Sequence, residues 1–132
     1  MNTLLETQLK RAKAAARLLK NMPTCTKNQA LDKIADALIA HSDEILEANK
    51  KDMAHAKEVN MTKAMQDRLL FTHERIVGVS EGVKKVATLP DPIGEVMESW
   101  TRPNGLKISK VRVPIGVFGI IYEARPNVTV DI

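Results

Sequence analysis

The sequence has few aromatic side chains, one cysteine and no long apolar run. Aromatic residues make up 3% of its 132 residues, too few for the stacking platform that binds single-stranded nucleic acid. Cys25 stands alone, so no disulfide can form within the chain. The longest apolar run, Val117 to Tyr122, is far shorter than the roughly 20 residues of a membrane span. The N-terminus also lacks the pattern of a secretory signal, so we expect a cytoplasmic protein without membrane association.

Charge is present but scattered. The 20 basic and 16 acidic residues give a net charge of +4, and they alternate in stretches such as KKDMAHAKE. Nucleic-acid binding requires clustered basic residues on one face. The composition therefore predicts a solvated, mildly basic surface and no nucleic-acid partner.

The first two-thirds of the sequence predicts helices. Leucines and alanines recur at spacings of three and four up to Pro23, which ends the first helix because it lacks an N–H group. A short separate helix is predicted within residues 50–59. Leu89-Pro90-Asp91-Pro92 then breaks the helical pattern. Side chains suited to cap the successive helices are Thr3 with Glu6, Thr26 with Gln29, Ser42, Thr62 and Thr72.

The pattern changes after Pro92. Residues 96–101 and 106–113 alternate around Arg102-Pro103-Asn104-Gly105, which predicts a β-hairpin. Val117 to Tyr122 is continuously apolar, as in a parallel strand that is buried on both faces. Its sheet is not in the sequence, so we expect an open-ended fragment of an α/β fold in which this strand would be exposed. The predicted layout is a helical region (1–92), a hairpin (93–114) and the start of a third region (115–132).

The segment Tyr122-Glu123-Ala124-Arg125-Pro126-Asn127 follows this predicted strand. Ligands of open α/β sheets bind beyond the carboxyl ends of the strands. Arg125 offers a planar fork of donors for phosphate or carboxylate, and the Asn127 amide can donate to a developing oxyanion. The same residues also suit an ordinary loop in which Asn127 caps the next helix, and local chemistry alone leaves both interpretations open.

A family resemblance adds to this interpretation. VPIGVFGIIYEARPNVTVD resembles the strand and loop that open the cofactor-binding domain of the aldehyde dehydrogenase superfamily. YEARPNVTVD in particular is similar to the γ-glutamyl phosphate reductase family, and ILEANKKDM, DRLLFTHERI and LPDPIGEV resemble the family's N-terminal helices and hairpin. The resemblance covers nearly the whole chain.

The resemblance implies a reaction that uses NADP(H). L-glutamyl 5-phosphate would be reduced by NADPH to L-glutamate 5-semialdehyde and phosphate, a step of proline synthesis, through a thioester on a cysteine. Asn127 would be the catalytic oxyanion donor, Glu123, Ala124, Arg125 and Pro126 would contact the cofactor, and Arg125 and Asn127 would contact the substrate. The full-length enzyme would be a homo-oligomer that uses the hairpin as a contact, and Trp100 would be a packing or subunit-contact residue. The nucleophilic cysteine would lie beyond residue 132, so these residues alone would be inactive.

Other interpretations compete with this one. Cys25 has no base nearby in the sequence and is expected to be structural or incidental. His41, His55 and His73 lack the spacing of a metal site. A basic helical binding module without catalysis is the main alternative. Another acyl-phosphate or acyl-CoA reductase would share Asn127 but not the surrounding residues.

Overall fold

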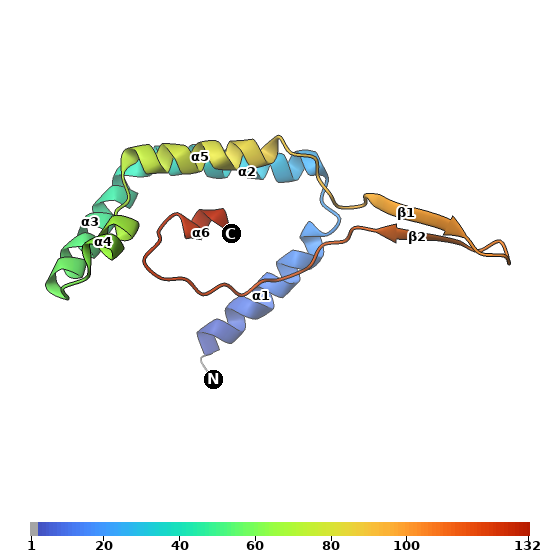
Figure 1. Ribbon diagram of the computed structural model, residues 1–132, viewed down its shortest axis with the longest axis horizontal. Coiled ribbons are helices and arrows are strands. Elements are labelled where there is room, and N and C mark those ends of the chain that lie inside the picture. Colours follow the sequence, from blue (N-terminus) through green and yellow to red (C-terminus); the bar gives the residue numbers. More distant parts are fainter. Residues whose placement is uncertain (1–2) are drawn as a thin grey trace. The chain divides into compact units, whose positions relative to one another are not determined.

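Residues 3–132 are the part of the chain described by the computed structural model, and they form six helices and one two-stranded antiparallel sheet (Figure 1). None of these helices has the length and apolar content that a membrane span requires. The chain divides into two compact units. The first unit consists of the residues up to Thr24 together with Pro90–Gly119, and the second consists of Cys25–Leu89 together with Ile120–Ile132. The elements are α1 (Thr3–Leu19), α2 (Thr24–Ala40), α3 (Ser42–Glu58), α4 (Lys63–Leu69), α5 (His73–Ala87), β1 (Val96–Thr101), β2 (Lys107–Val111) and α6 (Val128–Asp131).

The first unit contains α1 and the hairpin. β1 and β2 pair antiparallel, with Trp100 opposite Ile108. Gly105 has φ +85°, and its N–H donates to Arg102 O over 2.9 Å, which closes the predicted turn. Thr24 Oγ1 donates to Asp91 Oδ2 over 2.9 Å. The predicted hairpin is confirmed, whereas its proposed role as a subunit contact stays a prediction.

Every buried residue of the described chain lies in the second unit. Ala35 and Ile76 are fully buried, and Phe71 is 7% exposed. The Ser80 hydroxyl donates to Ala35 O over 3.0 Å and Lys84 Nζ lies 2.9 Å from Asp36 Oδ1. These two contacts join α5 to α2, and they lie on the same side of α5 because their spacing of four is about one helical turn.

Two of the predicted helix caps are confirmed. Thr62 Oγ1 accepts from Met65 N over 3.4 Å, and Thr72 Oγ1 accepts from Arg75 N over 3.2 Å. Each hydroxyl satisfies one of the free N–H groups at a helix start.

Other helix boundaries were predicted wrongly. α2 begins at Thr24, so Thr26 lies inside the helix and cannot cap it. The N-cap of α3 is His41, and Ser42 is the first helical residue. The separate helix predicted within residues 50–59 does not exist, because α3 continues through them to Glu58. No glycine or proline interrupts that stretch, so nothing in it opposes helix continuation.

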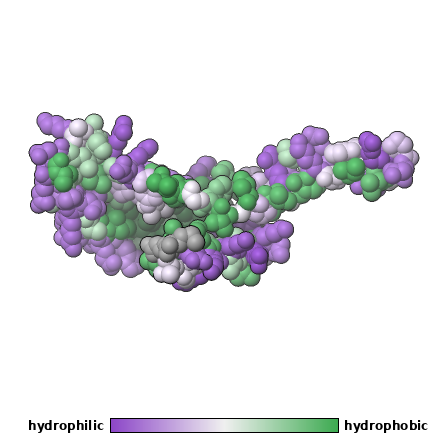
Figure 2. Space-filling view, turned by 90° about the horizontal axis from the view of Figure 1, so that it is seen from below, coloured by the Kyte–Doolittle hydropathy of each residue, from purple (hydrophilic) through white to green (hydrophobic). Residues whose placement is uncertain are grey.

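The strand predicted for Val117 to Tyr122 does not form among residues 3–132. The segment is extended and unpaired, and Phe118 is 65% exposed and Ile121 fully exposed. A strand requires a neighbour for its backbone N–H and C=O groups, and none of the described residues provides one. Residues 3–132 are therefore mostly helical with one hairpin, and no parallel sheet forms among them. Hydrophobic and hydrophilic residues are interspersed over the face shown in Figure 2.

Candidate functional site

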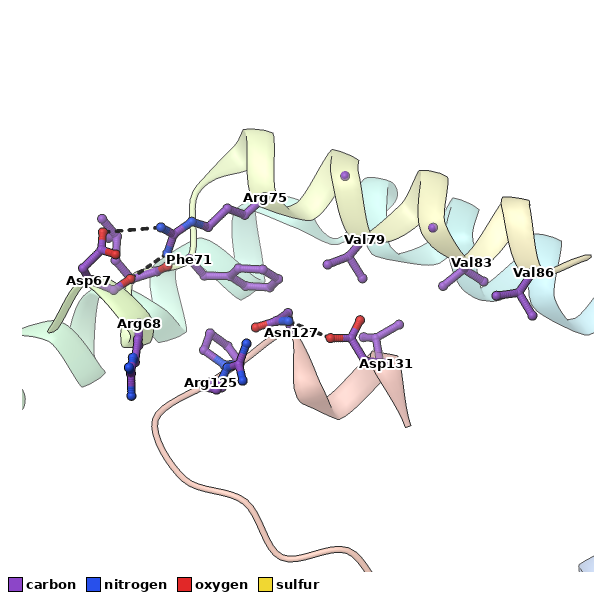
Figure 3. Close-up of a pocket in the computed structure, with 15 residues that line it drawn as sticks. Asp67, Arg68, Phe71, Arg75, Val79, Val83, Val86, Arg125, Asn127 and Asp131 are labelled. Carbon is purple, nitrogen blue, oxygen red and sulfur yellow. Dashed lines mark hydrogen bonds and ion pairs between the residues drawn. The ribbon is translucent and has the colours of Figure 1, made fainter. Parts of the chain in front are cut away.

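A hollow of about 610 Å³ lies within the second unit between α4, α5 and the segment that leads into α6 (Figure 3). Pockets of this size hold small molecules. Apolar side chains of α5 form one wall, and they include Val79, Val83 and Val86. Polar and charged side chains from α4, the start of α5 and the C-terminal segment complete the lining, namely Asp67, Arg68, Arg75, Arg125, Asn127 and Asp131.

Arg75 fixes the end of α4 against the start of α5. Its Nη1 donates to Asp67 O over 2.6 Å and also to Leu70 O, and its Nη2 lies 3.4 Å from Asp67 Oδ1. A cation at these carbonyls suits the negative end of the α4 dipole. The guanidinium is thus occupied by contacts within the protein, as the dashed lines in Figure 3 show.

Asn49 of α3 holds the connection between α4 and α5 from the inside. Its Nδ2 donates to Leu69 O over 2.9 Å, and its Oδ1 accepts from Phe71 N over 2.8 Å. Asn49 is 5% exposed and Phe71 is 7% exposed. The two bonds place the Phe71 ring where it lines both this hollow and a neighbouring one of about 300 Å³.

The segment before α6 turns sharply. Ala124 has φ +50°, a left-handed backbone conformation that residues other than glycine rarely adopt. Val128 N then donates to Arg125 O over 3.1 Å and Thr129 N donates to Pro126 O over 3.3 Å, and the Tyr122 and Thr129 hydroxyls are hydrogen-bonded. The turn brings three successive residues to the hollow, Arg125, Pro126 and Asn127.

Asn127 occupies the N-cap position of α6, but its side chain makes no capping bond to the backbone. Instead Nδ2 donates to Asp131 Oδ2 over 2.6 Å, a contact drawn as a dashed line in Figure 3. Because an amide nitrogen carries two N–H groups, one donor of Asn127 is left for another acceptor. The carboxylate of Asp131 therefore orients the amide at the edge of the hollow.

The sequence-based site residues separate into two groups. Arg125, Pro126 and Asn127 line the hollow, whereas Glu123 and Ala124 do not. The structure adds Arg68, Arg75 and Asp131 to the lining, and sequence reasoning had not selected any of these three. Asp131 could have been found from its spacing of four to Asn127, which places both side chains on one face of a helix.

The remaining chemistry-bearing side chains lie elsewhere. Cys25 is exposed, and its Sγ is 4.0 Å from Thr26 Oγ1. His41 contacts Glu44 at 3.1 Å and His55 contacts Glu58 at 3.5 Å, both on the surface of α3 or at its N-cap. Within residues 3–132 no three His, Cys, Asp or Glu side chains gather closely enough to hold a metal ion.

Comparison with known proteins gives a consistent result. No protein-family model matches the chain. The chain is 56% identical over 120 residues to the gamma-glutamyl phosphate reductase of Clostridium novyi, with 91% of this chain and 29% of that protein covered. The Moorella thermoacetica gamma-glutamyl phosphate reductase is 53% identical over 133 residues, with 99% of this chain and 32% of that protein covered. The chain thus spans about a third of the length of these relatives.

Solved structures agree with the sequence relatives. The crystal structure of gamma-glutamyl phosphate reductase from Thermotoga maritima matches with a TM-score of 0.91 and 45% identity, covering 96% of this chain and 30% of that one. The gamma-glutamyl phosphate reductase of Saccharomyces cerevisiae matches with a TM-score of 0.86 and 37% identity, covering 92% and 31%.

Proposed function

We propose that this chain, a homologue of the γ-glutamyl phosphate reductases that matches their N-terminal portion, supplies part of the active site of such an enzyme. The enzyme would reduce L-glutamyl 5-phosphate with NADPH to L-glutamate 5-semialdehyde and phosphate. Sequence identity above 50% across nearly the whole chain carries the proposal. It favours the reductase over a basic binding module, which composition alone left open.

The same homology supports a layout for these residues. Residues 1–92 would be the helical region, 93–114 the hairpin that meets another subunit, and 115–132 the beginning of the cofactor-binding domain. The whole enzyme would then be a homo-oligomer of the cytoplasm.

The residues before α6 fit one polar end of a dinucleotide. Arg125 is exposed, and its side chain makes no hydrogen bond or ion pair with any of residues 3–132. The backbone N–H groups of Glu123 and Ala124 also donate no hydrogen bond within that range. We assign cofactor contacts to Glu123, Ala124, Arg125 and Pro126. NADPH supplies the hydride when it is bound, while this segment contributes a cation and backbone donors.

Asn127 would act on the substrate. Its amide is held by Asp131 at one N–H, and the second N–H can donate to the substrate oxygen on which negative charge develops. A donor fixed in this way stabilises the transition state without reorganising, an effect worth about 10²–10³ in kcat for a single hydrogen bond. Asp131 sets the direction of that donor because the bond between them is short and charge-assisted.

Grafting tests the proposal. This chain would replace the matching 30% of the Thermotoga maritima reductase, and the graft would be assayed for NADP reduction that requires both glutamate 5-semialdehyde and phosphate. We expect activity within about tenfold of the parent, because an active site tolerates changes that leave its geometry in place. The corresponding segment of the Saccharomyces cerevisiae enzyme serves as the control graft. An active control graft beside a folded but inactive graft of this chain would refute the proposal.

A further inference from the structure

Two guanidinium groups at the hollow have no partner within the described residues. Arg68 comes from α4 and Arg125 from the segment before α6, and both line the cavity (Figure 3). Neither makes a side-chain hydrogen bond or ion pair anywhere in residues 3–132. Arg75 differs from them, because Asp67 and the end of α4 accept from three of its five N–H donors.

The acidic groups of the same hollow are already engaged. Asp67 contacts Arg75, and Asp131 accepts from the Asn127 amide. The titratable lining residues are three arginines and two aspartates, so one positive charge is in excess. Two cationic side chains from separate elements repel each other when they face one cavity, and an anion placed between them would offset that repulsion.

The surroundings leave both arginines accessible to an anion. Phe71 is buried, and Val79 and Val83 are half-buried in the α5 wall of the same hollow. Arg68 and Arg125 are themselves exposed, so their donors are accessible to an anion that enters from solvent. A guanidinium presents parallel N–H donors that match the paired oxygens of a carboxylate or phosphate.

We infer that Arg68 and Arg125 together bind an anionic group of the substrate. The inference rests on the proposed reductase function and adds Arg68 to its binding residues. Glutamyl 5-phosphate carries two such groups, the phosphoryl group and the α-carboxylate. A carboxylate is planar and a phosphoryl group is tetrahedral, but each can offer two oxygens to a guanidinium fork. The shared chemistry is an oxyanion, and kinetics must separate the two sources.

Steady-state kinetics of the Thermotoga graft provides the main test. In the NADP-reducing direction, Arg68→Gln should raise a substrate KM about 10- to 100-fold with little change in kcat, because the contact exists in ground and transition states alike. A rise in the KM for phosphate identifies the phosphoryl group, and a rise in the KM for glutamate 5-semialdehyde identifies the carboxylate. Arg125→Gln should change the same KM and, because Arg125 is also assigned to the cofactor, should raise the KM for NADP as well. Arg68→Lys should restore part of the loss because it keeps the charge but not the fork.

An exposed arginine on α1 provides the control. Arg11→Gln removes the same charge from the first unit and should leave every KM within twofold. The inference is wrong if Arg68→Gln changes no KM by more than twofold, or if it raises the KM for NADP alone.

Ligand-induced stabilisation keeps this test independent of catalysis. Inorganic phosphate, or glutamate if the carboxylate is the bound group, should raise the melting temperature of the unmodified graft through binding to the folded state. The shift should disappear in Arg68→Gln and persist in Arg11→Gln. An inactive graft that keeps this Arg68-dependent shift would refute the proposed function but support the anion site. A shift that is equal in all variants would overturn the site whatever the activity.

Discussion

Replacing Asn49 with alanine should loosen the polar side of the hollow from within. Asn49 lies on α3, yet its amide bonds to Leu69 O and Phe71 N, on the connection that carries Arg68 and Arg75 on either side. The two bonds measure 2.9 and 2.8 Å, and the asparagine is 5% exposed. Alanine has no side-chain amide, so Leu69 O and Phe71 N both lose their hydrogen-bond partner.

The expected cost follows from the two groups left behind. A buried donor or acceptor without a partner costs about 1–3 kcal/mol, so the Leu69 carbonyl and the Phe71 N–H together set an upper limit of about 6 kcal/mol. Asn49 and Phe71 also line the hollow of about 300 Å³, which is large enough to hold water. A water molecule there could bond to either the Leu69 carbonyl or the Phe71 N–H and so reduce the cost. We therefore expect a local destabilisation of about 2–4 kcal/mol.

Amide hydrogen exchange at Phe71 in the Thermotoga graft measures this local free energy. A loss of 2–4 kcal/mol corresponds to exchange that is about 30- to 700-fold faster. Asn49→Asp separates the two bonds, because its carboxylate still accepts from Phe71 N but cannot donate to Leu69 O. It should therefore protect Phe71 better than Asn49→Ala does.

Asn21→Ala is the matched control. Asn21 is exposed between α1 and α2, and surface substitutions of this kind change stability by less than about 0.5 kcal/mol. If the exchange rate of Phe71 in Asn49→Ala stayed within threefold of the rate in Asn21→Ala, the two bonds would not stabilise the connection as argued.

Two further predictions concern catalysis and pH. Asn127→Ala in the graft should lower kcat about 10²–10³-fold with the KM for NADP nearly unchanged. Asp131→Asn should lower kcat by less, since the amide then loses only its orientation. Normal kcat with a lowered melting temperature in Asn127→Ala would show that the contact with Asp131 is structural and that the oxyanion assignment is wrong. The side-chain hydrogen bond and the charge of Asp36 raise the pKa of Lys84 above its ordinary 10.5, so the pair stabilises the fold below pH 10.5 and this contribution is lost as the pH rises through the raised pKa. Denaturation of Lys84→Met and the parent at pH 8 and pH 11.5 should show a larger stability difference at the lower pH. An equal difference at both would contradict the pairing.

Local signals in the sequence were sufficient for part of the fold. Thr62 and Thr72 were predicted as caps because a hydroxyl bonds to an N–H three residues ahead, which is a property of a few neighbouring residues. The hairpin turn was predicted for the same reason, since Asn104-Gly105 allows the positive φ seen at Gly105. Such features depend on spacing along the chain, and spacing is visible in the sequence.

Features that depend on distant partners were not predicted. The bonds of Asn49 and Ser80 reach across 20 to 45 residues, so nothing adjacent to either residue in the sequence indicates them. The apolar run at Val117 to Tyr122 indicates a buried strand by composition, but burial and pairing require other segments. Among residues 3–132 those segments are absent, and the run is exposed.

The arginines of the hollow show why the site could be identified only from the sequence and the structure together. Arg68 and Arg75 lie seven residues apart and have the same charge and reach, so the sequence gives no reason to treat them differently. In the structure Arg75 points at the last carbonyls of α4 and is occupied, whereas Arg68 shares a cavity with Arg125 and has no partner within the described residues. A cation becomes a candidate binding residue when its donors are free and directed at a cavity, and both conditions depend on the fold. Asn127 illustrates the reverse case, since its residue type indicated a donor while only the structure shows that Asp131 directs it.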